Sequence, residues 1–539
     1  MTDQPPHDQQ PPTPPTPPAP PNGPPPGYGY PQAPPPPPQP GYGYPAQPGY
    51  GYPAQPPTVV AGDDTRAREN RTIALIILAA VVAIGLIIGS GVWYARSSGD
   101  GSGGKPTGGG KNGTRTVTGG KEKVPADPTA DLLFKVPQPK PGENVTTTDG
   151  SWLTDTVYAN TGVSEVVGYD PADGTKRWTI KLPGPVCAGS RHVTPDGRAA
   201  IVFRPSVPTR THLAGCTQVA ALDLVKGTRL WTKSVGTDDF AMKFQNVTVT
   251  RNTVAAGGLE GGIAYDMATG KVLWQPKPGD SCSDIGYGGG TRLVAVRKCG
   301  PYGNETLSIQ TLDPTSGKVL SEYKMGAGIS YAGIVSTDPL VVGADAGEAA
   351  GGGSGVSDYF SIDGRTGKLL ARIPVPGDAY EGECDTITRL EDCKGVVAGE
   401  GRLYLATGEH KDTGDLGRTN EIVAFDLATG KQTGQRASAG KDRTLFPLQM
   451  DGGNLLAWKM PSYEHSGEVV SVSGADFTSR TLLEIPGDKA SHDMVSGMPV
   501  EFVKFRFGHG RLFMSQANVA KPLGLETERN LIVAFGTHD

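Results

Sequence analysis

From residue 131 onward, short apolar runs alternate with polar turns, and one phrase recurs among them. It consists of an apolar run, an Asp, a Gly four positions later and a second apolar run. The phrase starts at six positions: Asp170, Asp223, Asp266, Asp313, Asp363 and Asp426. The steps between these positions are 53, 43, 47, 50 and 63 residues. A period of this size, built from strand-like segments, predicts an all-β propeller in which each repeat forms one blade.

Each residue type in the phrase has a structural role. The Asp carboxylate can accept backbone N–H groups across a tight turn, and the Gly can adopt the positive φ that such a turn requires. In the first three copies the second run carries a tryptophan: Trp178, Trp231 or Trp274. A large ring at this position can pack between neighbouring sheets. Because these residues recur in repeat after repeat, we interpret them as turn and packing residues and not as ligand contacts.

The number of blades depends on both ends of the repeat region. A degenerate seventh turn includes Asp476, and a last apolar strand, Leu531–Phe535, has no strand after it. The segment Asp131–Val136 resembles the return strand of a repeat but precedes the first one. Pairing these two segments would complete an eighth blade and remove two exposed strand edges. We therefore predict eight blades, and seven is the alternative.

The phrases Tyr265–Trp274 and Ala424–Lys431 resemble the repeat of pyrroloquinoline-quinone-type propellers. The resemblance covers about residues 131–539, although Ser321, Ala371 and Gly434 replace the tryptophan in three copies. The same repeat occurs in the lipoprotein of the outer-membrane barrel assembly machinery, which binds no quinone. Family enzymes hold their quinone between a Trp and a disulfide of two adjacent cysteines, beside a calcium ion. No two cysteines are adjacent here, so we predict no cofactor.

Composition divides the chain before the propeller into three parts. Residues 1–65 are rich in Pro, Gly and Tyr, which predicts a disordered cytoplasmic tail. Thr72–Ala95 is a run of 24 uncharged residues, long enough to be a transmembrane helix. Within it, Gly85 and Gly89 form a small-xxx-small pair that could support a weak homodimer. Residues 97–130 are rich in Gly and predict a flexible linker to the propeller at 131–539.

Cysteines decide the orientation, because basic residues on the two sides of the span are nearly balanced. Six cysteines fall into three neighbouring pairs: Cys187 with Cys216, Cys282 with Cys299, and Cys384 with Cys393. An even number at short separations predicts disulfides in an oxidising compartment, although six cysteines allow 15 pairings. We therefore expect a single-pass cell-membrane protein with a cytoplasmic N-terminus and an extracellular propeller.

Candidate chemistry is sparse. Metalloprotease, phosphate-loop and nucleophile-elbow motifs are missing, and we predict no catalytic, cofactor-binding or metal-ligating residue. A net charge of −5 gives no reason to expect nucleic-acid binding. The segment Glu381–Cys393 is acidic, and predicts either a solvated insertion or a contact for a basic partner or a cation.

The function expected from these observations is a non-catalytic scaffold or sensor that binds a protein or a small-molecule ligand outside the cell. The order of tail, span and linker resembles that of actinobacterial cell-envelope proteins. The alternative is an enzyme, either a quinone-dependent dehydrogenase or one with an unrecognised site in the central channel.

Overall fold

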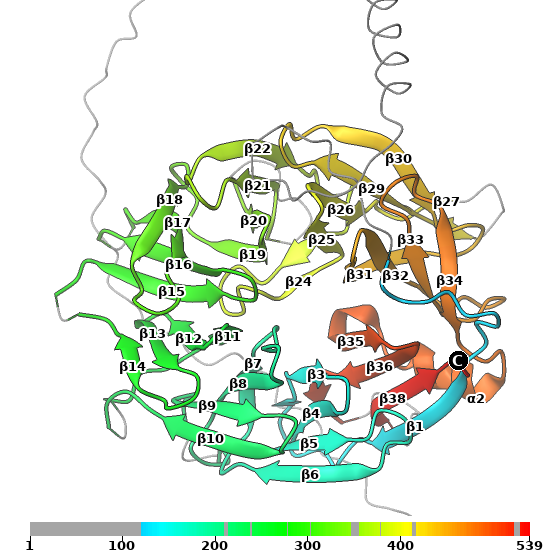
Figure 1. The fold of residues 1–539 in the computed structure, drawn as a ribbon, viewed down its shortest axis with the longest axis horizontal. Coiled ribbons are helices and arrows are strands. Elements are labelled where there is room, and N and C mark those ends of the chain that lie inside the picture. The colour runs from blue at the N-terminus through cyan, green and yellow to red at the C-terminus, as the bar shows by residue number, and fades with distance from the viewer. Residues whose placement is uncertain are drawn as a thin grey trace, which may run out of the picture. The chain divides into compact units, whose positions relative to one another are not determined.

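The computed structural model describes residues 120–538 except 210–213, 238–239, 278, 302, 347–354, 378, 412–416 and 522–528. The predicted tail, the span Thr72–Ala95 with Gly85 and Gly89, and most of the linker lie outside the described residues. Within the described part, no helix has the length and apolar character needed to cross a membrane. Eight four-stranded antiparallel sheets stand around a central channel (Figure 1). The prediction of an eight-bladed propeller is confirmed, and the seven-blade alternative is wrong.

Each blade is named here from its innermost to its outermost strand. Blade 1 contains β3 (Ser151–Leu153), β4 (Tyr158–Gly162), β5 (Glu165–Tyr169) and β6 (Lys176–Lys181). Blade 2 contains β7 (Val186–Gly189), β8 (Arg198–Phe203), β9 (Gln218–Asp223) and β10 (Thr228–Lys233). Blade 3 contains β11 (Asn246–Thr250), β12 (Thr253–Gly258), β13 (Gly261–Asp266) and β14 (Val272–Trp274). Blade 4 contains β15 (Cys282–Gly288), β16 (Leu293–Cys299), β17 (Thr306–Leu312) and β18 (Val319–Lys324).

The second half of the ring follows the same order. Blade 5 contains β19 (Ala332–Thr337), β20 (Leu340–Ala344), β21 (Asp358–Ile362) and β22 (Leu369–Pro374). Blade 6 contains β25 (Val396–Gly399), β26 (Arg402–Ala406), β29 (Glu421–Asp426) and β30 (Gln432–Ser438). Blade 7 contains β31 (Leu445–Asp451), β32 (Asn454–Lys459), β33 (Glu468–Val472) and β34 (Ser479–Glu484). Blade 8 contains β35 (Val503–Gly508), β36 (Arg511–Gln516), β38 (Asn530–Gly536) and β1 (Asp131–Pro137).

Smaller elements lie in the connections between these strands. Three two-stranded sheets pair β2 (Thr146–Thr147) with β37 (Asn518–Val519), β23 (Glu383–Cys384) with β24 (Cys393–Lys394), and β27 (His410–Lys411) with β28 (Arg418–Thr419). Helix α2 (Lys489–Ser496) and the short 3-10 helix η2 (Val500–Phe502) precede β35. The core is formed where neighbouring sheets pack face to face through buried Val, Ile, Leu and Ala side chains.

Blade 8 is built from both ends of the described chain. Strand β1 pairs antiparallel with β38, with Asp131 opposite Gly536 and Pro137 opposite Asn530. The two strands lie side by side next to the C-terminus (Figure 1). The predicted pairing of 131–136 with the C-terminal strand is confirmed, and it leaves no gap between the first and last repeats.

The recurring Asp and Gly form the predicted turns. Asp170 Oδ1 accepts a hydrogen bond from the Ala172 amide at 2.9 Å, and a hydrogen bond from Arg177 helps to hold its pKa below the ordinary value. Six repeat glycines adopt φ values from +67° to +72°: Gly174, Gly227, Gly270, Gly317, Gly367 and Gly430. A side chain at these positions would be strained, so the sequence phrase reflects turn geometry.

The repeat tryptophans each lie over the turn of the next blade. A Cβ atom at Gly227 would stand 2.1 Å from Cγ of Trp178, and the same relation joins Trp231 to Gly270 and Trp274 to Gly317. Phe134 of β1 covers Gly174 in the same way. The interpretation of these rings as packing residues is therefore confirmed, and the packing continues across the junction of the two chain ends.

At the interface between blades 6 and 7, the aromatic ring comes from the turn of blade 7 and the glycine from the outer strand of blade 6. This is the reverse of the arrangement at the interfaces with a repeat tryptophan. Gly434 stands at the tryptophan position of blade 6, and Phe477 stands at the glycine position of blade 7 with φ +62°. The amide of Phe477 donates to the Ser473 carbonyl at 2.9 Å, as Gly174 does to Asp170 in blade 1. The Phe477 ring is buried and stacks on Tyr404 at 6.0 Å between centroids. Blade 7 thus tolerates a strained backbone because its aromatic ring fills the interface from the other side.

This exchange makes Phe477 a sensitive position. Phe477→Ala should lower the free energy of unfolding by about 3–5 kcal/mol, because it removes a buried ring and keeps the strained φ. Phe477→Gly should cost about 1–2 kcal/mol less than the alanine variant, since glycine relieves the left-handed backbone. Urea unfolding of both variants measures the difference. Equal losses would show that the positive φ carries no strain.

Candidate functional site

The central channel contains a cavity of about 600 Å³. Its wall comes mainly from the innermost strands β3, β7, β11, β19, β25, β31 and β35 and from the residues next to them. We call the end of the channel where these strands begin the plug end, and the end where they finish the open end. Residues 384–393, here called the plug, form the loop that contributes Arg389, Glu391 and Asp392 to the cavity wall.

The plug is packed into the channel at the end where the inner strands begin. The Ile334 amide of β19 donates to the Leu390 carbonyl at 2.5 Å, and the Leu390 side chain is fully buried. Asn246, the first residue of β11, donates through Nδ2 to the Thr388 carbonyl at 3.5 Å. The expectation of a solvated insertion at Glu381–Cys393 is therefore wrong for this loop, because its apolar tip and its acidic side chains meet partners inside the ring.

Glu391 is the deepest carboxylate of the plug. Its Oε1 atom lies 3.1 Å from Nε2 of His192 and accepts a hydrogen bond from the Gly289 amide at 2.9 Å. Burial alone would raise the pKa of Glu391, but attraction to His192 and these hydrogen bonds outweigh burial, and the pKa lies below its ordinary value. The carboxylate therefore joins the plug to blades 2 and 4.

A second charged cluster fastens the plug to blades 1 and 8. Lys504 Nζ lies 3.1 Å from an oxygen of Asp149 and 3.1 Å from an oxygen of Asp392. Arg389 approaches Asp149 at 3.4 Å and Asp392 at 3.8 Å. Although burial opposes ionisation, Lys504, Lys394 and Arg389 lower the pKa of Asp392 to about 2. Each side chain of this cluster therefore lies beside a group of opposite charge.

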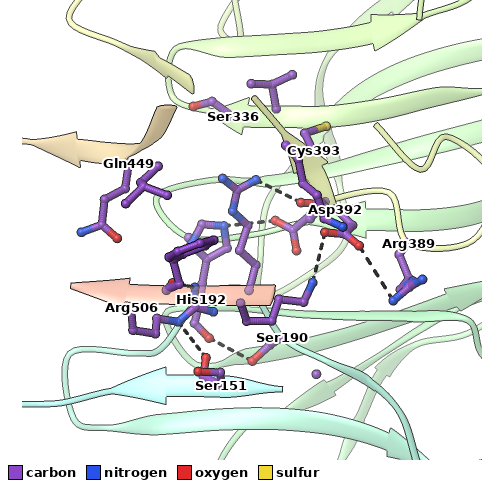
Figure 2. Close-up of a pocket in the computed structure, with 18 of the residues that line it drawn as sticks. Ser151, Ser190, His192, Ser336, Arg389, Asp392, Cys393, Gln449 and Arg506 are labelled. Carbon is purple, nitrogen blue, oxygen red and sulfur yellow. Dashed lines mark hydrogen bonds and ion pairs between the residues drawn. The ribbon is translucent and has the colours of Figure 1, made fainter. Parts of the chain in front are cut away.

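Two further arginines line the cavity, and neither forms an ion pair with a described residue. Arg506 Nε donates to the Ser151 carbonyl at 2.8 Å, as the dashed line in Figure 2 shows, and Nη1 donates to the Phe505 carbonyl at 3.0 Å. Arg191 Nη1 donates to the Glu391 carbonyl at 3.0 Å. Desolvation lowers the pKa of Arg506, and repulsion from Arg191 acts in the same direction. Within the described part of the chain, these two arginines contact only backbone carbonyls in the cavity wall.

The six cysteines form three disulfides, which are the three predicted pairings: Cys187–Cys216, Cys282–Cys299 and Cys384–Cys393. The first ties the start of β7 to the loop before β9, and the second joins the paired strands β15 and β16. The third closes the plug, and only its Cys393 contributes to the cavity wall.

Sequence reasoning did not identify Asp149, Lys504 or Arg506. Asp149 and Lys504 are 355 residues apart and become neighbours only because the ring closes. Charged residues at the edges of strands carry no local pattern, and His192 was only one of several scattered histidines. A charge within an apolar inner strand, such as Arg506 in β35, is the one signal that the sequence offered.

The lining residues do not match the quinone site of the family enzymes. The cysteine that faces the cavity is bonded to a partner nine positions away, so it is not part of an adjacent pair. Trp152 is fully buried and donates its indole N–H to the Ser190 carbonyl at 2.8 Å, so its ring presents no open face to a ligand. Among the described residues, no three His, Cys, Asp or Glu side chains gather in a way that could hold a metal ion.

Comparison with known proteins gives the family. Solved structures resemble this chain at low identity: BamB from Moraxella catarrhalis at 11% (TM-score 0.39, covering 76% of this chain and 100% of BamB) and two quinohemoprotein alcohol dehydrogenases at 12%. The dehydrogenases come from Pseudomonas putida HK5 and Comamonas testosteroni, each with a TM-score of 0.42 and coverage of 76% of both chains. These structural likenesses carry no argument about function. No curated protein matches the chain.

A protein-family profile matches residues 81–277 and 215–459, which together span more than half of the chain. Its description is outer membrane protein assembly factor BamB. The chain belongs to this family of propellers with pyrroloquinoline-quinone-like repeats.

Proposed function

We propose that this protein is a membrane-anchored, extracytoplasmic propeller that binds another protein at its plug end and performs no catalysis. The predicted span at Thr72–Ala95 supplies the anchor, and the three disulfides support an oxidising location for the propeller. The family description, an assembly factor, fits a role carried out through contacts with other proteins.

The distribution of exposed apolar side chains carries the proposal. Because strands alternate in direction, the β8–β9, β12–β13 and β32–β33 connections lie at the plug end, as do the connections that lead into each inner strand. These connections hold Val207, Leu259, Tyr463, Phe240, Ile387 and Phe502, which are 49–98% exposed. On the Asp–Gly turns at the open end, Val225 is the one exposed large apolar side chain among the described residues. Six more large apolar side chains are exposed on outermost strands, at the rim of the ring: Leu132, Val272, Val319, Leu320, Leu369 and Leu370. The apolar side chains on the plug-end connections favour a protein contact at that end.

Ile387 and Phe502 belong to segments that reach the channel cavity, through Arg389 and Val500 respectively. Ile387 belongs to the plug and is 49% exposed, and Phe502 ends η2 and is 56% exposed. Lys394, directly after the plug, donates to the Glu501 carbonyl, which brings the two segments together. The Phe502 carbonyl accepts a hydrogen bond from Ala517 at 2.8 Å. A ring held on a fixed backbone loses little entropy on binding, which is typical of an interface hot spot.

The enzyme alternative receives less support. A quinone would need the adjacent cysteines and the open tryptophan face of the family enzymes, and the cavity supplies neither. In the described residues the charged groups of the plug are used for mutual ion pairs, so none is left as an acid or base at a reacting atom.

Affinity capture with the full chain tests the proposal. Phe502→Ser and Ile387→Ser should each reduce the yield of a partner that the native chain retains by about tenfold or more, because truncating a hot-spot residue costs about 2 kcal/mol. The matched control is Val225→Ser, which removes an equally exposed apolar side chain from the open end and should leave the yield unchanged. Equal retention by all four proteins would contradict a contact at the plug end.

A further inference from the structure

We infer that the channel cavity is a binding site for a small organic anion whose carboxylate or phosphate group is held by Arg506 and Arg191. This site is separate from the protein contact proposed above, because neither Ile387 nor Phe502 lines the cavity. The inference rests on the charge balance of the cavity, on the free donors of the two arginines and on the chemistry of the walls.

The carboxylates that line the cavity are all committed to cations other than these two arginines. Asp149 and Asp392 share Lys504 and Arg389, and Glu391 faces His192. The remaining lining carboxylate, Asp338, lies 3.5 Å from Arg292, which is not part of the cavity wall. The described lining holds five Lys and Arg side chains against four carboxylates, so the wall carries excess positive charge. Besides Arg191 and Arg506, Lys394 lines the cavity without a described ion pair, but its ammonium donates to the Glu501 carbonyl outside the wall.

Both arginines keep N–H groups without a partner among the described residues. A guanidinium carries five donors, whereas Arg506 uses two on the carbonyls of Ser151 and Phe505 and Arg191 uses one on the Glu391 carbonyl. Neutral carbonyls satisfy hydrogen bonds but do not neutralise a buried charge. Arg191 disfavours the charged form of Arg506, so an anion bound by both side chains would offset that repulsion and gain charge-assisted hydrogen bonds.

The rest of the wall suits an organic body and not a bare ion. Phe446, Met450, Val397 and Leu153 add apolar surface to the cavity, and Ser336 and Gln449 add a few polar atoms (Figure 2). A volume of about 600 Å³ falls within the range of small-molecule sites. The structure thus points to a compact anion with an apolar part.

Three probes distinguish a carboxylate ligand from a phosphate ligand and from a neutral one: benzoate, inorganic phosphate, and benzamide, the neutral isostere of benzoate. We expect calorimetric titration of the full chain in detergent to show saturable binding of benzoate or phosphate, and no binding of benzamide. Arg506→Gln and Arg191→Gln should each weaken that binding about tenfold or more, and Arg506→Lys should weaken it less. The control Arg177→Gln removes the same charge from an exposed turn and should bind as the native chain does.

Each outcome decides the inference. Binding of benzoate alone assigns a carboxylate ligand, and binding of phosphate alone assigns a phosphate ligand. If neither anion binds, if benzamide binds as well as benzoate, or if Arg191→Gln binds as tightly as the native chain, the inference is wrong. Arg191→Gln remains decisive if Arg506→Gln does not fold. Because the titration does not use a protein partner, its result is independent of the capture experiment with Phe502→Ser.

Discussion

A chain that lacks residues 120–137 is expected to lose about 5 kcal/mol or more of its free energy of unfolding. The deletion removes β1, leaves the edge of β38 unpaired and uncovers the partly buried side chains that pack under Phe134. It also removes the Glu122 carboxylate, which accepts hydrogen bonds from the amides of His509 and Gly510 at 3.0 and 3.2 Å. Several half-buried apolar side chains at roughly 1 kcal/mol each, together with the lost strand hydrogen bonds, account for a loss of this magnitude in the free energy of unfolding.

Denaturant unfolding of the full chain and of the deletion variant measures this loss. The point variant Phe134→Ala should show part of it, about 2–3 kcal/mol, because it opens the contact with Gly174 but keeps the strand. Deletion of residues 1–65, which precede the predicted span and the repeats in the sequence, is the control and should leave the propeller transition unchanged. A deletion variant of 120–137 as stable as the native chain would contradict closure by β1.

Lys504→Met is expected to lower the free energy of unfolding by about 2–4 kcal/mol at pH 7. The methionine leaves Asp149 and Asp392 mostly buried, with Arg389 as the cation that still contacts both carboxylates. Breaking a buried ion pair from one side costs about 3–5 kcal/mol, and we reduce this figure because Lys504 is 18% exposed. Thermal unfolding measures the loss, and Lys504→Met with Asp392→Asn should recover part of it because the second change removes one stranded charge.

The pH dependence follows from the lowered pKa of Asp392. Its folded pKa of about 2 lies below the unfolded value of 3.8, so its ion pairs contribute full stability above about pH 4. That contribution is lost as the pH falls toward 2. The stability difference between the native chain and Lys504→Met should therefore shrink over this interval. A difference that stays constant from pH 7 to pH 2 would show that the lysine acts only through packing.

The parts of the fold that could be predicted from the sequence are those that repeat locally. Gly174 and Trp178 belong to one turn and one strand, so their spacing shows in any single copy of the phrase. Closure was predictable for the same reason, since 131–136 resembles a return strand and Leu531–Phe535 lacks one. The exchange of Gly434 and Phe477 was not predictable, because it depends on which of two facing blades supplies the ring.

The candidate site could not be predicted from local sequence patterns, because closure of the ring brings together residues that are far apart in the sequence. Glu391 meets His192 across 199 positions, and neither residue belongs to a motif. The acidic character of the plug suggested exposure, yet Lys504, Arg389 and His192 offset its charges inside the channel. Composition describes how polar a segment is, and only the fold decides whether its charges find partners.

Photo-crosslinking in intact cells tests the central claim most directly, namely that the plug end is a protein-binding face outside the membrane. A photoreactive amino acid would replace Phe502 or Ile387 at the plug end, and Val225 at the open end. If the plug end binds a protein, a covalent adduct with that protein should form from position 502 or 387 and not from position 225. Adducts from position 225 alone, or no adduct from either plug-end position while the protein is folded and present, would contradict it.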